Sequence, residues 1–137
     1  MTTGPAFDGP VVFDCEALTR IVSKEPYMTG VVTWARTCQQ PVVISAATIV
    51  EAAGPRSRHP AMLWAMSRLT VRPVTKEVAV LAATLLSDAS RKGHAMAIDA
   101  MVCATALLER GRPTIYTSDP TDIQLLTTGR ADVIPLR

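Results

Sequence analysis

Short apolar runs alternate with longer amphipathic segments along this chain, and the alternation predicts a fold. Pro10 precedes VVFD, a β-branched and aromatic run typical of a buried strand. From Glu16 the apolar positions take helical spacing, with Leu18 and Ile21 on one face, and we expect Pro26 to end that helix. A second helix is predicted from about residue 27 to residue 39.

The alternation continues to the end of the sequence. After the apolar strand VVI, Ser45 is a natural N-cap for the helix SAATIVEAA, which Gly54 and Pro55 are expected to end. The remaining segments are predicted to be the helix HPAMLWAMSRL, the strand TVRPV, the helix TKEVAVLAATLLSDAS capped by Thr75, the helix AIDAMVCATALLER, the strand TIYT, the helix SDPTDIQLL and the strand DVIPL.

Helices that separate short, continuous apolar strands favour a parallel sheet that is covered on both faces. The predicted fold class is therefore α/β, with three α/β/α layers around a central parallel sheet of four to five strands. No internal repeat, linker or low-complexity stretch divides residues 1–137, so we expect a single domain.

Composition narrows the candidate functions. Hydrophobic residues make up 48% of the sequence but aromatic residues only 4%, which argues against a surface that stacks nucleic-acid bases. No apolar run reaches the roughly 18 residues of a membrane helix, and the first ten residues do not resemble a secretory signal. Three cysteines without a CxxC pair, together with only two histidines, argue against a zinc site. We expect reduced cysteines in a cytoplasmic protein that does not associate with membranes.

The net charge of +2 is too small to identify a partner, but the distribution of charge is informative. If four of the 12 acidic residues share one pocket, eight remain against 14 lysines and arginines elsewhere. The remaining surface would then be basic and would suit a partner that carries phosphates. The candidate phosphate contacts, each of which by default faces only solvent, are Arg20, Lys24, Arg36, Arg91 and Lys92.

Four acids stand where an open α/β sheet collects its ligands, beyond the carboxyl ends of the strands. They are Asp14 after the first strand, Glu51 in the second turn of the helix after VVI, Asp99 in the first turn of AIDAMVCATAL, and Asp119 after TIYT. Each also has a purely structural explanation. Asp14 and Asp119 are candidate N-caps, Asp122 a first-turn acid, Asp99 a complement to the helix dipole, and Glu51 a solvated helix residue.

The four acids carry more weight as a set. Asp99 lies among Ala, Met, Val and Cys, where a charge is costly unless it is matched. Carboxylates gathered at one sheet edge repel one another unless a cation holds them. Mg²⁺ is bound by a few carboxylates together with waters and substrate phosphate, and no histidine or cysteine is placed to compete. The set therefore predicts a site for a hard divalent cation.

Together, VVFDCEAL, SAATIVEAA, AIDAMVCATAL and IYTSDPTDI resemble, in order and over nearly the whole chain, the PIN-domain family and within it the VapC-type toxins. The resemblance implies a PIN-like fold and a Mg²⁺- or Mn²⁺-dependent endoribonuclease that hydrolyses RNA by metal-activated water. It implies Asp14, Glu51, Asp99 and Asp119 as catalytic residues, with Asp14, Asp99 and Asp119 as metal ligands. It also implies an RNA substrate, a cognate antitoxin and a homodimer.

Five further residues qualify the resemblance. The resemblance makes Asp122 a candidate accessory acid and makes Thr117 and Ser118 candidates to orient water or metal. Many relatives have a small hydroxyl residue where this chain has Cys15, and a thiol is a weaker hydrogen-bond donor, so support of the first aspartate is expected to differ. We interpret Glu16 as a first-turn charge rather than a fifth acid.

Two other functions and one docking site stay open at this point. The chain could be a PIN-fold binding module that has lost turnover, an alternative that Cys15 keeps open. A receiver-like signalling domain is the other, although Glu16 is a poor second acid and DVIPLR lacks the expected lysine. An antitoxin tail is expected to enter a groove by the early helices, to which Val31, Val32 and Trp34 would contribute unless they pack in the core.

Overall fold

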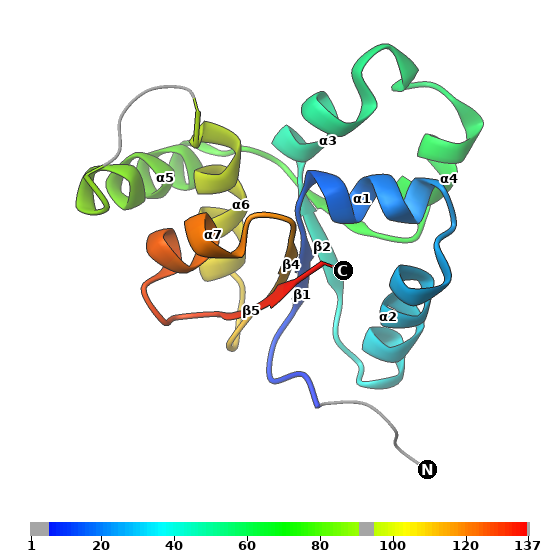
Figure 1. Ribbon diagram of the computed structural model, residues 1–137, viewed down its shortest axis with the longest axis horizontal. Helices are drawn as coiled ribbons and strands as arrows, with labels where there is room; N and C mark the ends of the chain where they lie inside the picture. Colours follow the sequence, from blue (N-terminus) through cyan, green and yellow to red (C-terminus); the bar gives the residue numbers. More distant parts are fainter. Residues whose placement is uncertain (1–5, 91–94, 137) are drawn as a thin grey trace.

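The computed structural model describes residues 6–90 and 95–136 (Figure 1). Five strands in these residues form one parallel sheet in the order β3-β2-β1-β4-β5. The strands are β1 (Val11–Phe13), β2 (Val42–Ser45), β3 (Thr70–Arg72), β4 (Thr114–Thr117) and β5 (Asp132–Pro135). The predicted parallel sheet is confirmed.

Seven α-helices and one short 3₁₀ turn, η1, connect the strands in the described part of the chain. They are α1 (Cys15–Val22), α2 (Pro26–Thr37), α3 (Ala46–Ala53), η1 (Gly54–Arg56), α4 (Pro60–Ser67), α5 (Lys76–Asp88), α6 (Ala97–Leu107) and α7 (Pro120–Thr127). None of these helices combines the length and the apolar composition that a membrane span requires.

One predicted helix boundary is wrong for a physical reason. Pro26 does not end α1 but is the first residue of α2, where its fixed φ suits a helical start and its missing N–H costs nothing. Helix α1 instead ends at Val22, and Lys24 turns the chain with a φ of 58°. By contrast, the side chains of Ser45 and Thr75 accept hydrogen bonds from the first turns of α3 and α5, as expected of N-caps.

Each face of the sheet has its own hydrophobic core, because successive strand residues point to opposite faces. Phe13 and Tyr116 pack edge to face at 5.8 Å between ring centroids, in the core that α1, α2 and α4 cover. Val12 and Ile115 point the other way, into the core beneath α5, α6 and α7. Figure 1 shows these two helical layers on opposite sides of the sheet, which confirms the three-layer α/β/α prediction.

Two glycines bring the amino ends of β1 and β4 together. A side chain at Gly9 would collide with the backbone of Arg112, and one at Gly111 would collide with the backbone of Asp8. Gly111 also has a φ of +86°, which residues with a Cβ rarely adopt. This close approach sets β1 beside β4, so that their carboxyl ends also lie next to each other.

The strand order places a crevice at those carboxyl ends. From central β1 the chain proceeds to β2 and β3 on one side, and then crosses to β4 and β5 on the other. Ligands of open α/β sheets bind where the order reverses in this way, here beyond β1 and β4. The order also differs from the 2-1-3-4-5 arrangement of receiver domains, so the receiver-like alternative is wrong.

Candidate active site

Backbone donors from two separate elements fix Asp14. It is the N-cap of α1, and its Oδ1 accepts from the Ala17 N–H at 2.9 Å. Its Oδ2 accepts from the N–H of Ser118, just beyond β4, at 2.8 Å. Asp14 is only 4% exposed. Its capping role is therefore real, yet Oδ1, with a single hydrogen bond from Ala17, keeps a lone pair for another partner.

The loop after β4 presents Asp119. Its backbone N–H donates to Thr117 Oγ1 at 2.9 Å, and the Ser118 hydroxyl lies 3.5 Å from the carboxylate of Asp14. Asp119 occupies the N-cap position of α7, but its side chain makes no capping bond. Capping therefore does not account for this exposed carboxylate. Thr117 and Ser118 shape the loop, and their contact with water or metal stays a prediction.

Asp99 experiences the charge of four acids from other parts of the chain. It is partly buried in the first turn of α6. Burial, followed in order of size by the charges of Asp119, Asp14, Asp122 and Glu51, raises the pKa of Asp99 from 3.8 to about 6. The acids after β1 and β4 and those on α3, α6 and α7 therefore act on one region of the molecule.

Cys15 lies among the same acids. Its thiol donates to the backbone carbonyl of Thr48 at 3.9 Å. Burial, a hydrogen bond with Glu51 and the charges of Glu51, Asp14 and Asp99 raise the pKa of the thiol well above its ordinary value. Cys15 is consequently a neutral donor rather than a reactive thiolate. It links α1 to α3, the helix that carries Glu51.

Thr48 is a polar residue that the sequence reasoning missed. It lies one turn before Glu51 in α3 and is fully buried. Its Oγ1 has no hydrogen-bond partner among the described residues. Helical residues three apart share a face, so its spacing from Glu51 was an available signal. The helix that carries Glu51 therefore also contains a buried hydroxyl without a described hydrogen-bond partner.

The acids share a region without forming a closed ligand cage. Within residues 6–90 and 95–136, no three His, Cys, Asp or Glu side chains are grouped so as to hold a metal ion. Repulsion between carboxylates opposes closer approach. The donor set still fits Mg²⁺ or Mn²⁺, because it consists of carboxylate oxygens and the raised pKa of Asp99 marks an excess of negative charge. Mg²⁺ in particular takes one or two carboxylates plus waters and phosphates rather than a complete protein cage.

One expected phosphate contact is already engaged by acids. Arg20 Nε lies 3.4 Å from Glu16 and 3.5 Å from Glu25. Glu16 is therefore a first-turn charge of α1 paired with Arg20, as interpreted from the sequence. Two other candidates, Arg91 and Lys92, lie outside the described residues.

The remaining candidates lie around α2. Lys24 and Arg36 are exposed. Val31 is buried in the core and, with Trp34, also lines a cavity of about 720 Å³ between α2 and the β4–β5 edge. Val32 packs against the core and lines a different cavity. The predicted groove residues therefore pack in or against the core and also line surface cavities.

No protein-family model matches the sequence, and no curated protein matches it at a significant level. Solved structures do match. A chain of DNA-bound VapBC from Salmonella typhimurium has a TM-score of 0.65 and 14% identity, over 93% of this chain and 98% of that chain. For a toxin–antitoxin complex from Klebsiella pneumoniae the values are 0.64 and 20%, over 90% and 95%.

A third structure gives the same result. VapBC2 from Rickettsia felis, bound to a DNA fragment from its promoter, has a TM-score of 0.65 and 11% identity, over 93% of this chain and 98% of that chain. At identities this low the likeness concerns the fold. The chain has the PIN-like three-layer α/β/α fold that these toxin–antitoxin structures contain.

Proposed function

We propose that the chain is a Mg²⁺- or Mn²⁺-dependent endoribonuclease and the toxin of a toxin–antitoxin pair. One observation carries the proposal: acids from four separate elements act on Asp99 at the point where the strand order reverses. Clustered acids repel one another and lower stability, and such clusters with a raised pKa are typical of functional sites. The fold shared with toxin–antitoxin structures supports the same function.

Each acid has a role that follows from its surroundings. Asp14, Asp99 and Asp119 would hold the ion, and Glu51 would complete the shell or orient a water. When bound, the ion would supply a water of lowered pKa and positive charge for the phosphate. Asp14 offers a rigid ligand because two backbone N–H groups hold it. Asp119 is exposed after the end of β4, where it would be accessible to a substrate phosphate.

A cleavage assay with defined metals tests the proposal. We expect the full chain to cut single-stranded RNA with Mn²⁺ or Mg²⁺, to leave 5′-phosphate ends, and to stop when EDTA is added. Asp14→Asn keeps the shape of the side chain but removes its charge, and should slow cleavage about 100-fold or more. Asp88→Asn is the matched control, because Asp88 ends α5 and is not among the acids that act on Asp99. Wild-type rates in Asp14→Asn would rule out the assignment.

A binding module without turnover is the second candidate. It is favoured by the neutral Cys15 thiol bonded to Glu51, and by the lack of a tight three-ligand group among the described residues. Calorimetric titration with Mn²⁺, followed by cleavage assays on several RNA pools, separates the two functions. Metal binding with no cleavage of any pool would favour the module.

We further propose a cognate antitoxin as partner, docked on α2. The cavity of about 720 Å³ there is lined mainly by apolar and aromatic residues, including Val31, Trp34 and Tyr116. Tyr27 at its edge is 47% exposed. Co-expression with the antitoxin should suppress cleavage, and Tyr27→Ala should weaken that suppression while leaving the free enzyme active. The homodimer is also a proposal, and sedimentation of the purified chain checks it.

A further inference from the structure

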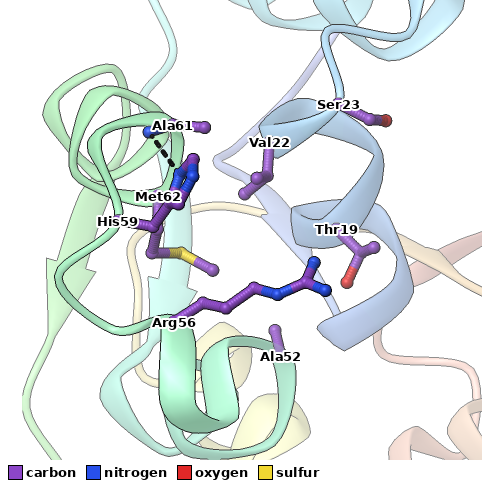
Figure 2. A pocket seen from close by; sticks show the side chains of 8 residues that line it. All are labelled: Thr19, Val22, Ser23, Ala52, Arg56, His59, Ala61 and Met62. Atoms are coloured by element: carbon purple, nitrogen blue, oxygen red, sulfur yellow. Dashed lines mark hydrogen bonds between the residues drawn. The ribbon is translucent and has the colours of Figure 1, made fainter.

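A cavity with both apolar and polar walls begins about one helical turn away from the acids. It has a volume of about 340 Å³ and lies between α1, α3 with η1, and α4 (Figure 2). Met62 and Val22 give it an apolar wall, and Thr19 lines the side nearer the acids. Figure 2 shows Arg56 reaching from the end of η1 across the cavity toward Thr19. His59 also lines it, with Nδ1 accepting from the Ala61 N–H at 3.1 Å.

The helices themselves connect this cavity to the candidate active site. The Thr19 hydroxyl donates to the backbone carbonyl of Cys15 at 2.9 Å, one turn back along α1. Four residues of α-helix rise about 6 Å. Across the cavity, Ala52 lines the wall and directly follows Glu51 in α3. The cavity therefore begins about one helical turn from the neighbours of Asp14 and Glu51. A strand bound at the acids would lie next to it.

A second cavity, of about 290 Å³, lies between α1, α2 and α4. Trp64, Arg68 and Arg36 line it. The Lys24 ammonium lies 4.8 Å from the centroid of the Trp64 ring, and the Arg68 guanidinium carbon lies 5.6 Å from it. Ile21 lines this cavity and the next two residues, Val22 and Ser23, line the first, so the end of α1 lies between the two. We call the two cavities, together with Lys24 over the Trp64 ring, the α1–α4 seam.

The basic side chains of the seam are not neutralised by acids. Arg20, Arg72 and Arg112 are ion-paired elsewhere in the described structure. Glu16 and Glu25, the acids on the neighbouring turns, are both engaged by Arg20. The seam residues that form no ion pair within residues 6–90 and 95–136 are Lys24, Arg36, Arg56 and Arg68.

We propose that the α1–α4 seam binds single-stranded RNA on one side of the acids, with Arg56 on a backbone phosphate and Trp64 stacked on a base. The proposal rests on the proposed ribonuclease function and names how its substrate is held. Unpaired cations that alternate with apolar walls and an aromatic ring are what a single strand requires. Few aromatics in the sequence had argued against base stacking, but one well-placed ring is enough.

An acidic peptide segment is the competing occupant. Its carboxylates would pair with the cations equally well. An acidic side chain, however, has no flat ring that could replace Lys24 and Arg68 on the face of Trp64. A base can make that exchange, because stacking is stronger than an exposed cation–π contact, and it frees Lys24 for a phosphate. The seam also continues from the acids that would cut the strand. These features favour RNA over a peptide.

Binding is measured without cleavage. In EDTA, the variant Trp34→Phe leaves Trp64 as the only tryptophan of the two in the chain, so its fluorescence reports on the seam. An RNA of about ten nucleotides should quench this fluorescence. Arg56→Ala should weaken binding about tenfold and lower the salt dependence by about one phosphate contact. Arg58→Ala, exposed two residues away and outside both cavities, should bind as the parent does.

Each outcome bears on the seam separately from the nuclease. Quenching by polyglutamate but not by RNA would overturn the proposal in favour of a peptide, and equal RNA binding by Arg56→Ala and the parent would overturn it outright. Circular dichroism on each variant confirms that it is folded. In the cleavage assay, Arg56→Ala should raise KM about tenfold with little change in kcat. If RNA binds in EDTA but no metal supports cleavage, the seam survives and the ribonuclease function fails.

Discussion

The two ends of the parallel sheet handle charge in opposite ways. At the amino end, Arg112 lies 3.0 Å from the carboxylate of Asp132 and donates to the Gly129 carbonyl at 2.9 Å. At the carboxyl end, every group that acts on Asp99 raises its pKa, and no cation within residues 6–90 and 95–136 offsets these acids in their effect on Asp99. One end is closed and neutralised, whereas the other keeps an excess of negative charge.

The difference separates stability from function within one small fold. At the amino end, the closely packed backbone at Gly9 and Gly111 holds β1 beside β4, and the Arg112–Asp132 pair ties the start of β4 to the start of β5. This packing fixes the spacing of the acids at the other end. The stability of the amino end allows the carboxyl end to keep acids close together, although their mutual repulsion is unfavourable in the metal-free protein. Substitutions at the two ends should therefore change stability in opposite directions.

The largest effect is expected from Gly111→Ala at the amino end. The new methyl group would meet the Asp8 carbonyl, and the φ of +86° is unfavourable for alanine. Steric overlap and backbone strain together should lower the free energy of unfolding by about 3 kcal/mol, measured by urea denaturation. Gly30→Ala is the control. It lies in α2 with nothing near its Cβ position, and should stabilise by about 0.5–1 kcal/mol. Equal stabilities for the two variants would contradict a closed amino end.

Asp99→Asn should have the opposite sign. Because the pKa of Asp99 rises to about 6 on folding, the fold favours its protonated form. The contribution of this group to stability is therefore greatest below about pH 4 and is lost as the pH rises through 6. In EDTA, Asp99→Asn should raise the melting temperature at pH 7.5 but not at pH 4. Asp88→Asn should show no such pH dependence, and a lower melting temperature for Asp99→Asn at pH 7.5 would contradict the comparison.

The sequence predicted the features that depend on local chemistry. Helical spacing, the N-caps Ser45 and Thr75, and the placement of acids after apolar strands were all correct, because each depends on neighbours within a few residues. The reach of Asp99 toward the other acids followed from one further rule, that parallel strands end at a common edge. The metal itself and the catalytic roles stay predictions.

Long-range pairings were beyond the sequence. Asp14 accepts from the N–H of Ser118 across 104 residues, and Cys15 donates to Thr48 across 33. No local pattern specifies such partners, because they depend on the strand order and on how α1 packs against α3. The cavity that Arg56 lines was missed for the same reason, since Gly54 and Pro55 before it indicated only the end of a helix.

Thr48→Val sharpens the comparison at the carboxyl end. The Thr48 hydroxyl is buried without a partner in the described residues, and valine keeps its shape while removing the polar atom. We expect stabilisation of about 1 kcal/mol in EDTA. Thr105→Val is the matched control, because that buried hydroxyl donates to the Met101 carbonyl at 2.7 Å and its loss should cost about 1 kcal/mol. Destabilisation by Thr48→Val would show that the hydroxyl is satisfied in solution.

The ion pair between Arg112 and Asp132 should have the smallest effect. Both partners of the Arg112–Asp132 pair are about half exposed, so the pair should contribute about 0.5 kcal/mol, which a double-mutant cycle with Asp132→Ala measures. Its response to salt is more informative than its size. High salt weakens this attraction, which lowers stability, and it also screens the repulsion around Asp99, which raises stability. Salt therefore has opposite effects on stability at the two ends of the sheet. In EDTA at pH 7.5, the wild type should gain stability as salt is added, because the repulsive end is less exposed and interacts more strongly. Asp99→Asn should remove that gain, and Arg112→Ala should enlarge it slightly. A wild type that loses stability with salt would show that the paired end dominates.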